Sequence, residues 1–418
     1  MSRKLSLNFW CPLNRLLVVN LYYAPESFGG ATIVTEETSR RLQDDHDWAV
    51  LVVTTMRDHS LPAFLLKRYK VKGVNVVAIN LPFDSMGEDA YRNPAVARCV
   101  LDIARSFRPD VCHSHAIQVI GCGFFEDFVS DGIKLAVTVH DCWWVCERQF
   151  MINSDGLYCN QWSIDEEQCR HCTSDYSGMH KRNAYLREQL HQVDLLLFPS
   201  EFHKRLHLAN GFREEVSEVN KNGVTMPLKN YSRDRTEQKN RRKELVFGFV
   251  GGPGFIKGAD QVIEAFNGLE RTDYTLRVVD AAANVGGSWK NNRYWTIPGK
   301  LEFVPPYCQE TMDSFFASID VLLFPSQWKE SFGLTVREAL VRDVWVIATD
   351  AGGVAEDLED GINANVVPFG SGIHTLKSAI ENALEGKQWK RYENPNRRVV
   401  RDFDEQTQEI SRYLSALI

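Results

Sequence analysis

Short apolar runs rich in β-branched residues alternate with longer amphipathic stretches along the whole chain. Parallel strands buried on both faces have this kind of sequence, and the helices that cover them account for the amphipathic stretches. The predicted strands are residues 16–20, 50–54, 74–80, 111–113, 135–139 and 195–198 in the first half, and 246–250, 275–279, 301–304, 321–324 and 344–348 in the second. The predicted fold class is therefore α/β, with enough strands in each half for a doubly wound sheet.

The length of 418 residues predicts two domains, because a single hydrophobic core usually stops growing beyond about 250–300 residues. The segment 229–244 is predicted to be the linker, since charged and amide side chains dominate it without an apolar period. We therefore expect domains at 1–228 and 245–397. In residues 398–418, apolar side chains at roughly helical spacing predict a final amphipathic helix.

Composition and charge exclude several classes of protein. Apolar residues make up 44% and charged residues 25% of the chain, which is ordinary for a globular protein. The net charge of -7 argues against nucleic acid as a partner, because binding its phosphates needs clustered cations. No stretch reaches the ~18 uncharged apolar residues of a membrane-spanning helix, and no cleavage site follows the apolar N-terminal stretch. We expect a cytoplasmic protein.

One basic run, which contains Lys67, Arg68, Lys70 and Lys72, stands out locally. Each cation near an anionic membrane surface contributes about 1 kcal/mol of attraction, so this run is a candidate for peripheral contact with the inner membrane face. The alternative is a solvated face with no partner.

The strongest motif is a pair of glutamates, Glu330 and Glu338, that follows the predicted strand 321–324. If a helix begins at 332–334, its free backbone N–H groups would face a docked phosphate. Glu330 would then lie on the entering loop and Glu338 within the helix, so that the two carboxylates reach different hydroxyls of one sugar nucleotide. Spacing alone favours ordinary helix and surface acids. The glycine turn at 350–353, after another predicted strand, reverses that preference, because ligands of open α/β sheets bind at the carboxyl ends of strands.

The segment 324–338, followed by 350–353 and Gly361, resembles the C-terminal donor motif of glycosyltransferase family 4. The resemblance extends from about residue 15 to about residue 385, in the order that the family shows. Its other members are Tyr23, Pro25, Gly29 and Gly30 (glycine loop), His113 and His115 ("H-x-H" turn), residues 138–141 ("HD" turn), Ser200, residues 222–224, and residues 251–258 with Gly251, Gly252 and Lys257.

This resemblance implies the GT-B fold: two facing Rossmann-like domains, a deep interdomain cleft, and a C-terminal helix that returns to the N-terminal domain. It implies that the first domain takes the acceptor and the second the donor, with retention at the anomeric carbon and no catalytic metal.

The implied catalytic residues are His140 at the donor sugar, Glu330 on sugar hydroxyls and Lys257 on the diphosphate. Glu338 is expected to bind the ribose. The other implied donor-binding residues, at the nucleotide, its phosphates or the acceptor, are Gly29, Gly30, Gly251, Gly252, Ser331, Phe332, Gly333 and Leu334.

The physical chemistry of the transfer supports a role for Lys257. A leaving nucleoside diphosphate gains negative charge in the transition state, so a fixed cation and helix N–H groups stabilise that state more than the ground state. Many family members carry an arginine where this chain has Gly252. Diphosphate binding would then depend more on Lys257 and the helix dipole, or Lys290 would substitute. Of the histidines, His113 is read as a structural histidine at the end of a strand. His140 is read as functional, because its strand also points at the cleft.

Five of the ten cysteines crowd into one segment, and four of them, Cys146, Cys159, Cys169 and Cys172, are candidate zinc ligands. The two-residue gap between Cys169 and Cys172 is common in such sites, and four thiolates would make a closed structural site that pins the insertion 142–173. Some family members carry a similar insertion. Disulfides and reduced thiols without a role are the alternatives, and the lack of an export signal disfavours disulfides.

The sequence thus predicts a retaining, hexosyltransferase-type enzyme. Its donor would be a nucleotide-diphosphate sugar, and its acceptor a glycan or a lipid-linked glycan in surface polysaccharide or lipopolysaccharide synthesis. A transferase acting on a small soluble acceptor is one alternative, and an inactive GT-B-like binding subunit is another, suggested by the missing arginine. A nucleotide-dependent oxidoreductase fits less well, since no G-x-G-x-x-G follows the first predicted strand.

Overall fold

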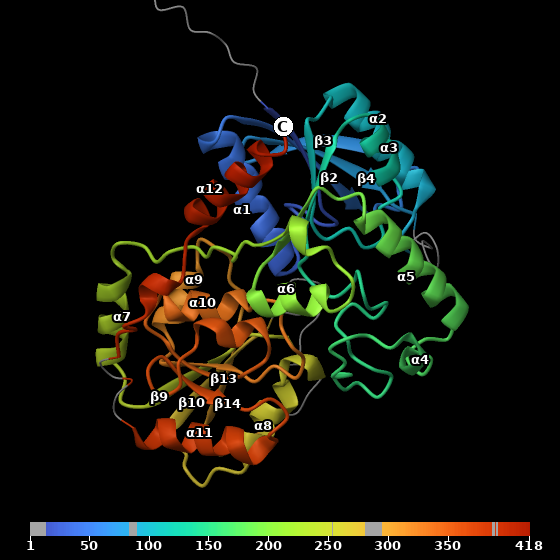
Figure 1. Cartoon of the computed structure of the whole chain (residues 1–418). Helices are drawn as coiled ribbons and strands as arrows, with labels where there is room; N and C mark the ends of the chain where they lie inside the picture. Colours follow the sequence, from blue (N-terminus) through green and yellow to red (C-terminus); the bar gives the residue numbers. More distant parts are fainter. Residues whose placement is uncertain (1–13, 83–89, 253, 281–294, 387–388, 390–391) are drawn as a thin grey trace, which may run out of the picture. The chain divides into compact units, whose positions relative to one another are not determined.

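The computed structural model describes the chain except for residues 1–13, 83–89, 253, 281–294, 387–388 and 390–391 (Figure 1). The chain forms two compact units, each assembled from segments that are distant in sequence. The first unit comprises the residues up to Thr138, Glu188–Leu197 and Thr407–Ile418, and the second comprises Val139–Arg187 and Phe198–Gln406. The predicted domain boundaries stay predictions.

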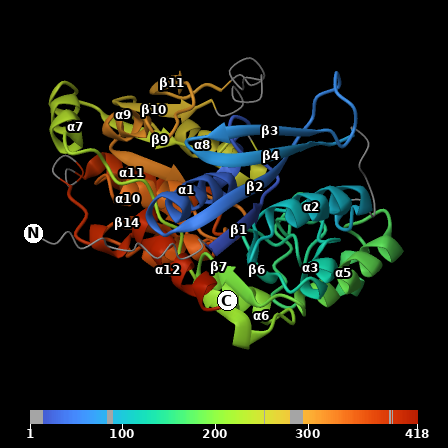
Figure 2. The ribbon, with the colours of Figure 1, turned by 90° about the horizontal axis from the view of Figure 1, so that it is seen from above.

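The first unit contains seven strands of one sheet, in the order β3-β4-β2-β1-β5-β6-β7. The strands are β1 (Asn14–Val19), β2 (Trp48–Met56), β3 (Leu66–Val71), β4 (Val74–Asn80), β5 (Val111–Ser114), β6 (Lys134–Thr138) and β7 (Leu195–Phe198). Their recorded pairings are parallel except that of β3 with β4. Figure 2 shows β3 and β4 side by side along one margin of this sheet.

The helices of the first unit are α1 (Gly29–Asp45), α2 (Pro94–Phe107), α3 (Phe125–Ser130) and most of α12 (Phe403–Ser415). Helix α2 begins after Asn93, whose side chain accepts the Val96 N–H, and Pro94 occupies the first turn, where its missing N–H is harmless. Ile410 and Leu414 of α12 lie in the same core cluster as Leu16 and Val52. The final amphipathic helix therefore buries its apolar face in this unit.

The basic run that includes Lys67 and Arg68 forms the edge strand β3, which the predicted strands did not include. Its side chains are mostly exposed. Lysine and arginine on an edge strand discourage pairing with another chain, and this gives the run a structural reason to be basic.

The second unit contains a parallel sheet in the order β11-β10-β9-β12-β13-β14. The strands are β9 (Leu245–Phe249), β10 (Tyr274–Val279), β11 (Lys300–Val304), β12 (Val321–Phe324), β13 (Trp345–Thr349) and β14 (Ala364–Val367), and β8 (Ser217–Val219) precedes them in the chain. Helices α8 (Ala259–Asn267) and α11 (Ile373–Glu385) share one core cluster with the sheet, and α9 (Met312–Ala317) and α10 (Leu334–Leu340) share another. The two helix pairs lie on opposite sides of these strands in Figure 1. The predicted α/β class is confirmed.

The predicted linker at 229–244 is wrong, because this segment contains helix α7 (Tyr231–Asn240), which packs against α9. Tyr231 and Arg235 are buried. The Tyr231 hydroxyl donates to the Arg342 carbonyl at 2.8 Å. The Arg235 guanidinium donates to the carbonyls of Phe316, Ile319 and Asp343 at 2.7–2.8 Å. A buried arginine satisfied by carbonyls leaves no apolar period in the sequence, so pattern reasoning misses such a helix.

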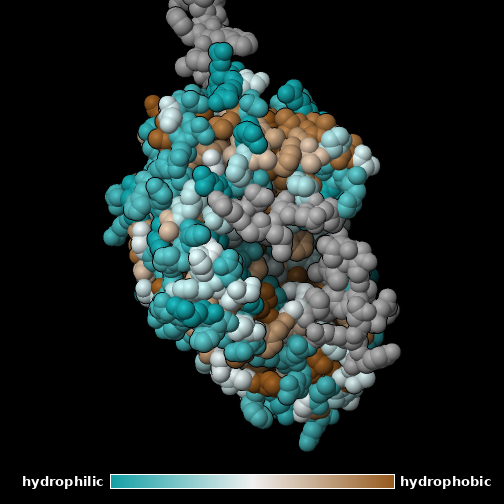
Figure 3. All heavy atoms as spheres, turned by 90° about the vertical axis from the view of Figure 1, so that its right-hand side faces the viewer, coloured by the Kyte–Doolittle hydropathy of each residue, from teal (hydrophilic) through white to brown (hydrophobic). Residues whose placement is uncertain are grey.

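The cysteine-rich insertion belongs to the second unit and contains α4 (Glu166–Cys169) near its C-terminal end. Helix α5 (Tyr176–Leu190) follows it, and its residues up to Arg187 belong to the same unit. It has one small apolar cluster, which it shares with α6 (Glu201–Leu208) through Leu206. In the described part of the chain no helix has the length and hydropathy that crossing a membrane requires. Hydrophilic side chains cover most of the described surface visible in Figure 3.

Candidate functional site

The loop after β12 buries Glu330, which is 6% exposed. One carboxylate oxygen of Glu330, Oε1, accepts hydrogen bonds from Lys257 Nζ at 2.7 Å and from Ser326 Oγ at 2.8 Å. The Glu330 N–H donates to the Ala351 carbonyl at 3.1 Å, and the Gly353 N–H donates to the Glu330 carbonyl at 2.9 Å. The loops after β12 and β13 are thus joined at the carboxyl edge of the sheet, where the sequence placed the donor.

Lys257 reaches Glu330 from a different loop, that after β9, where it ends the 3₁₀ turn η3 (Phe255–Lys257). Its ammonium lies 5.3 Å from the centroid of the Trp328 ring and 5.8 Å from that of Phe324. Both aromatic faces attract the cation. Lys257 is therefore held by one carboxylate and two rings, as a fixed positive charge at the edge of the sheet.

Glycines allow the loop after β9 and the loop after β12 to approach each other. Gly258 has φ of +76°, and a Cβ at this position would lie 2.1 Å from the Pro325 carbonyl oxygen. A Cβ on Gly251 would lie 3.0 Å from the Lys257 Cβ. Gly252 has φ of +80° with open space around it. This geometry accounts for Gly251 and Gly252 as backbone requirements, and their predicted contact with the donor stays a prediction.

Helix α10 begins at Leu334, as predicted, after Gly333 at φ +84°. A Cβ on Gly333 would lie 2.7 Å from a methyl group of Val354. Phe332 is buried, and the Arg337 guanidinium lies 4.1 Å from the centroid of its ring. The Ser331 carbonyl accepts the Ser200 hydroxyl at 2.6 Å, which ties the start of α6 to this loop.

Arg337, which sequence reasoning missed, holds the loop together from inside. It is fully buried and donates to Asp357 Oδ2 at 2.7 Å, to the Gly353 carbonyl at 2.8 Å and to the Phe332 carbonyl. Burial would raise the pKa of Asp357, but Arg337 and Lys221 hold it below its ordinary value. The sequence signal that could have indicated Arg337 is a basic residue directly before Glu338, in a helix that is otherwise mostly apolar.

Glu338 lies on α10, where it is 6% exposed. Burial raises the pKa of Glu338 to about 7, and the positive charge of Arg342 only partly offsets this rise. A buried acid that titrates near neutrality is typical of binding and catalytic sites. The two predicted glutamates thus differ, since Glu330 is paired with a cation at 2.7 Å and Glu338 has its charge opposed by burial.

His140 follows β6 and belongs to the same unit as Lys257 and Glu330. Burial lowers the pKa of His140 to about 4, so its imidazole is neutral at physiological pH. Asp141, directly before the insertion, anchors its first residues, because its carboxylate accepts the Trp143 N–H at 2.8 Å and the Gln149 side-chain amide at 2.6 Å. The predicted contact of His140 with the donor sugar stays a prediction.

Gly29, Gly30 and His113 lie in the first unit. Gly29 begins α1 at φ +79°, followed by Gly30, and their predicted role in donor binding stays a prediction. His113 is buried and hydrogen-bonded to Thr138 Oγ1 at 2.8 Å, which supports its structural reading. Lys290 lies outside the described residues.

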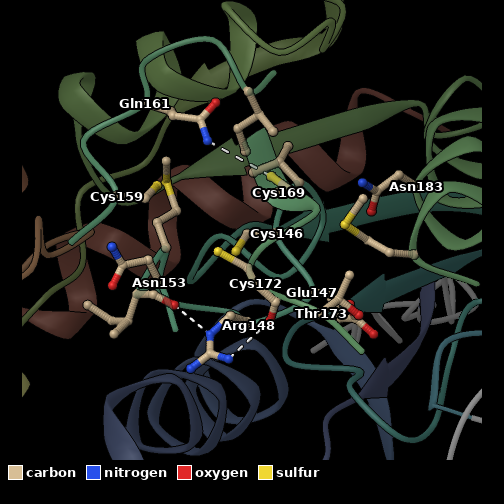
Figure 4. A pocket seen from close by; sticks show the side chains of 15 residues that line it. Cys146, Glu147, Arg148, Asn153, Cys159, Gln161, Cys169, Cys172, Thr173 and Asn183 are labelled. Carbon is tan, nitrogen blue, oxygen red and sulfur yellow. Dashed lines mark hydrogen bonds between the residues drawn. The ribbon is translucent and has the colours of Figure 1, made fainter. Parts of the chain in front are cut away.

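The four candidate zinc ligands, Cys146, Cys159, Cys169 and Cys172, line one pocket with a cavity of about 30 Å³ (Figure 4). The nine cysteines that the structure describes are free thiols. As placed, the described residues include no group of three or more His, Cys, Asp or Glu side chains that could hold a metal ion. The zinc site stays a prediction at this point.

Two family models match successive parts of the chain. "Glycosyltransferase Family 4" matches residues 28–226, and "Glycosyl transferases group 1" matches residues 231–399. A relative from Klebsiella pneumoniae, an uncharacterized 42.6 kDa protein in the cps region, is 22% identical over 88% of this chain and 96% of its own length.

Solved structures share the fold. Sucrose-phosphate synthase from Thermosynechococcus elongatus has a TM-score of 0.71 at 15% identity, covering 97% of this chain and 99% of that one. Anabaena Alr3699/HepE in complex with UDP-glucose has a TM-score of 0.64 at 17% identity, covering 96% of this chain and 99% of that one. These likenesses and the two α/β sheets show the GT-B fold, and the two family models show that the chain belongs to glycosyltransferase family 4.

Proposed function

We propose that this glycosyltransferase moves a hexosyl group, with retention at the anomeric carbon, from a nucleotide-diphosphate sugar to a glycan or lipid-linked glycan during capsular or other surface polysaccharide synthesis. The observation that carries the proposal is the ion pair of Lys257 with the buried Glu330, 2.7 Å apart at the carboxyl edge of the second sheet. The Klebsiella relative in the cps region supports the polysaccharide context. UDP-glucose, which Anabaena Alr3699/HepE binds, makes UDP-sugars the first donors to test.

The residues suit successive parts of one donor molecule. The Lys257 ammonium would neutralise the diphosphate as the glycosidic bond breaks and negative charge grows on the leaving oxygen. The second carboxylate oxygen of Glu330, which accepts neither Lys257 nor Ser326, would accept sugar hydroxyls. Glu338 would accept the ribose hydroxyls, and a neutral His140 can donate an N–H to a sugar hydroxyl without adding charge.

Thermal unfolding with UDP-, GDP-, ADP- and TDP-sugars tests the donor site. A donor at a hundred times its dissociation constant should add about 2.7 kcal/mol to the free energy of unfolding. Glu338→Ala should abolish the shift, while Arg233→Ala, an exposed change on α7, should leave it intact. No shift with any donor in a folded sample would favour the inactive binding subunit.

The stereochemistry and the acceptor need a second experiment. With an α-linked donor, ¹H NMR of the first product formed should show the α anomer, and a β anomer would refute retention. A competition assay that offers lipid-linked glycosyl diphosphates and free monosaccharides together distinguishes the proposed acceptor from a small soluble one. The exposed basic strand β3 predicts that vesicles with anionic lipid retain the protein at low salt more than neutral vesicles do.

A further inference from the structure

The cysteine-rich insertion is packed against the loop after β12, which carries Glu330. The ring centroids of Phe150 and Trp328 are 4.9 Å apart with the rings edge to face, and Trp328 is the aromatic face that Lys257 approaches to 5.3 Å. The Tyr158 ring lies 5.7 Å from that of Phe369. The insertion therefore forms one wall of the aromatic surroundings of the candidate site.

The insertion has little apolar material to hold it in that position. Between residues 142 and 173 the buried residues are Cys142, Trp143, Trp144 and Met151. Its helix α4 has four residues. A segment of this size with so small a core ordinarily needs a covalent or metal crosslink to stay ordered.

Four thiols come from four places in the insertion to one cavity, as Figure 4 shows. Backbone hydrogen bonds fix the backbone positions of these cysteines. The Cys146 N–H donates to the Cys142 carbonyl, the Cys159 N–H to the Met151 carbonyl, and the Cys172 N–H to the Cys169 carbonyl, each at 2.8 Å. The last of these closes a tight turn between two thiols separated by two residues, which is the usual form of a pair of zinc ligands.

The cavity suits a single ion. Its volume of about 30 Å³ has room for one or two water molecules. Its other walls include the apolar side chains of Val145, Met151 and Met179. Cys142, the fifth cysteine of the segment, is buried nearby but does not line the cavity, which singles out the other four.

We propose that Cys146, Cys159, Cys169 and Cys172 bind one structural zinc ion, and that this ion holds Phe150 against Trp328 beside Lys257 and Glu330. The four thiols each lose a proton to solvent as the four Zn–S bonds form, and no oxidant is needed. In the described residues the four thiols are not grouped closely enough to coordinate a metal ion. Zinc binding therefore requires the four side chains to rotate into the cavity, while their backbone positions stay the same. The site goes beyond the proposed transferase function, because its four sulfur ligands leave no position for a substrate.

Metal content of the full-length protein tests the site without reference to activity. Protein purified without a histidine tag should contain one zinc per chain by mass spectrometry of the elements. Cys169→Ser and Cys172→Ser should each lose most of the zinc, whereas Cys308→Ser, an exposed cysteine of the same unit, and Cys142→Ala should keep it. Replacement by cobalt should give the intense sulfur-to-metal absorption of a tetrahedral tetrathiolate site.

Two outcomes would overturn the zinc site. One is a folded protein without zinc whose four thiols all react with a thiol reagent. The other is a pair of disulfides among these cysteines, detected by mass spectrometry of unreduced peptides. If the cysteine variants do not fold, zinc titration of wild-type protein stripped by a chelator decides the matter, and recovery of less than half an equivalent refutes the site.

The positioning role has its own readout. Phe150→Leu should retain zinc but weaken donor binding by about threefold to tenfold, an effect of the size expected for the loss of one aromatic contact. The exposed Leu157→Ala of the same insertion should change neither. Zinc present with unchanged donor affinity in Phe150→Leu would refute the positioning role alone, and zinc present without any donor binding would refute the proposed function alone.

Discussion

Lys257 and Glu330 form one ion pair, although 73 residues separate them in the chain. The ammonium has the carboxylate on one side and the Trp328 and Phe324 rings around it. The carboxylate also accepts a hydrogen bond from the Ser326 hydroxyl. Because a donor diphosphate would compete for this ammonium, the pair is suited to keep the cation in place while the site is empty.

Removal of the cation should therefore affect both stability and transfer. Lys257→Met leaves the buried Glu330 carboxylate with Ser326 as its recorded partner, and the protein should lose about 1–3 kcal/mol of unfolding free energy. The kcat with the preferred donor should fall about 10²-fold to 10³-fold, as when one group that stabilises a developing oxyanion is removed. Lys257→Arg, which keeps the charge, is the control, and denaturant unfolding with steady-state kinetics gives the measurement. A kcat within threefold of wild type would contradict the role of Lys257.

Glu338 should make stability depend on pH. Its folded-state pKa is about 7, above the ordinary value of 4.5, so between these values the folded state holds a proton that the unfolded state has released. The stability that Glu338 contributes is thus full below about pH 4.5 and is lost as the pH rises through 7, by up to about 3 kcal/mol. Unfolding of wild type and Glu338→Gln from pH 5 to 8 should show this slope in wild type alone. Equal slopes would contradict the raised pKa.

The same carboxyl should make donor binding depend on pH in the opposite direction. Ribose hydroxyls donate to a carboxylate, so donor affinity measured by calorimetry should increase as the pH rises through about 7. Glu338→Gln should bind weakly with little dependence on pH over the same range. An affinity that falls with rising pH in wild type would remove Glu338 from the ribose site.

At the scale of elements, the joint between η3 and α8 depends on one glycine. Gly258 and Gly361 both have φ of +76°, but a Cβ would lie 2.1 Å from the Pro325 carbonyl oxygen at the first and would meet open space at the second. Gly361→Ala should therefore cost about 1 kcal/mol, from the backbone conformation alone. Gly258→Ala should cost clearly more, about 2–4 kcal/mol, and should weaken donor binding because η3 carries Lys257. Equal losses in the two variants would show that the loops separate without consequence.

The hydrogen bonds of Arg235 are one of the two anchors of helix α7, together with the Tyr231 hydroxyl. Arg235→Ala would leave the carbonyls of Phe316, Ile319 and Asp343 without that donor and should cost about 2–4 kcal/mol. Arg233→Ala, an exposed arginine of the same helix, should change the unfolding free energy by less than about 0.5 kcal/mol. Similar values for the two would mean that α7 behaves as the linker that its composition predicts.

At the scale of the whole molecule, the chain passes between the two compact units four times. Lys257, Glu330, Glu338 and His140 all belong to the second unit, and Gly29 and Gly30 belong to the first. The predicted donor site is therefore concentrated in one unit, and the glycine loop is its only predicted part in the other.

Hydrogen exchange should show this concentration directly. A bound nucleotide sugar should slow amide exchange in residues 254–258 and 326–338, because these loops carry the groups that would hold the diphosphate and the ribose. The edge strand β3 should exchange at the same rate with and without donor. Added protection at Gly29 and Gly30 would support their predicted role, whereas protection confined to the first unit would contradict the donor site proposed here.

Local sequence was a sound guide wherever structure depends on local periodicity and turn chemistry. The buried runs identified strands β9 to β13 closely but missed β14, and the glycines after strands identified the loops of the candidate site. Periodicity failed at β3, whose side chains are mostly exposed, and at α7, which is anchored by Tyr231 and Arg235 rather than by an apolar stripe. Arg337 and Ser326 were missed because each acts through a partner that folding brings to it.

The sequence by itself determined the α/β class, the family and the chemical types in the site, since apolar runs, glycine turns and the spacing of Glu330 and Glu338 are local properties. Only the tertiary structure decided that Lys257 pairs with Glu330, that burial makes Glu338 titrate near neutrality, and that Phe150 of the insertion meets Trp328. The physical reason is that ion pairing, desolvation and ring contacts depend on distances between side chains far apart in the chain, which no local pattern encodes.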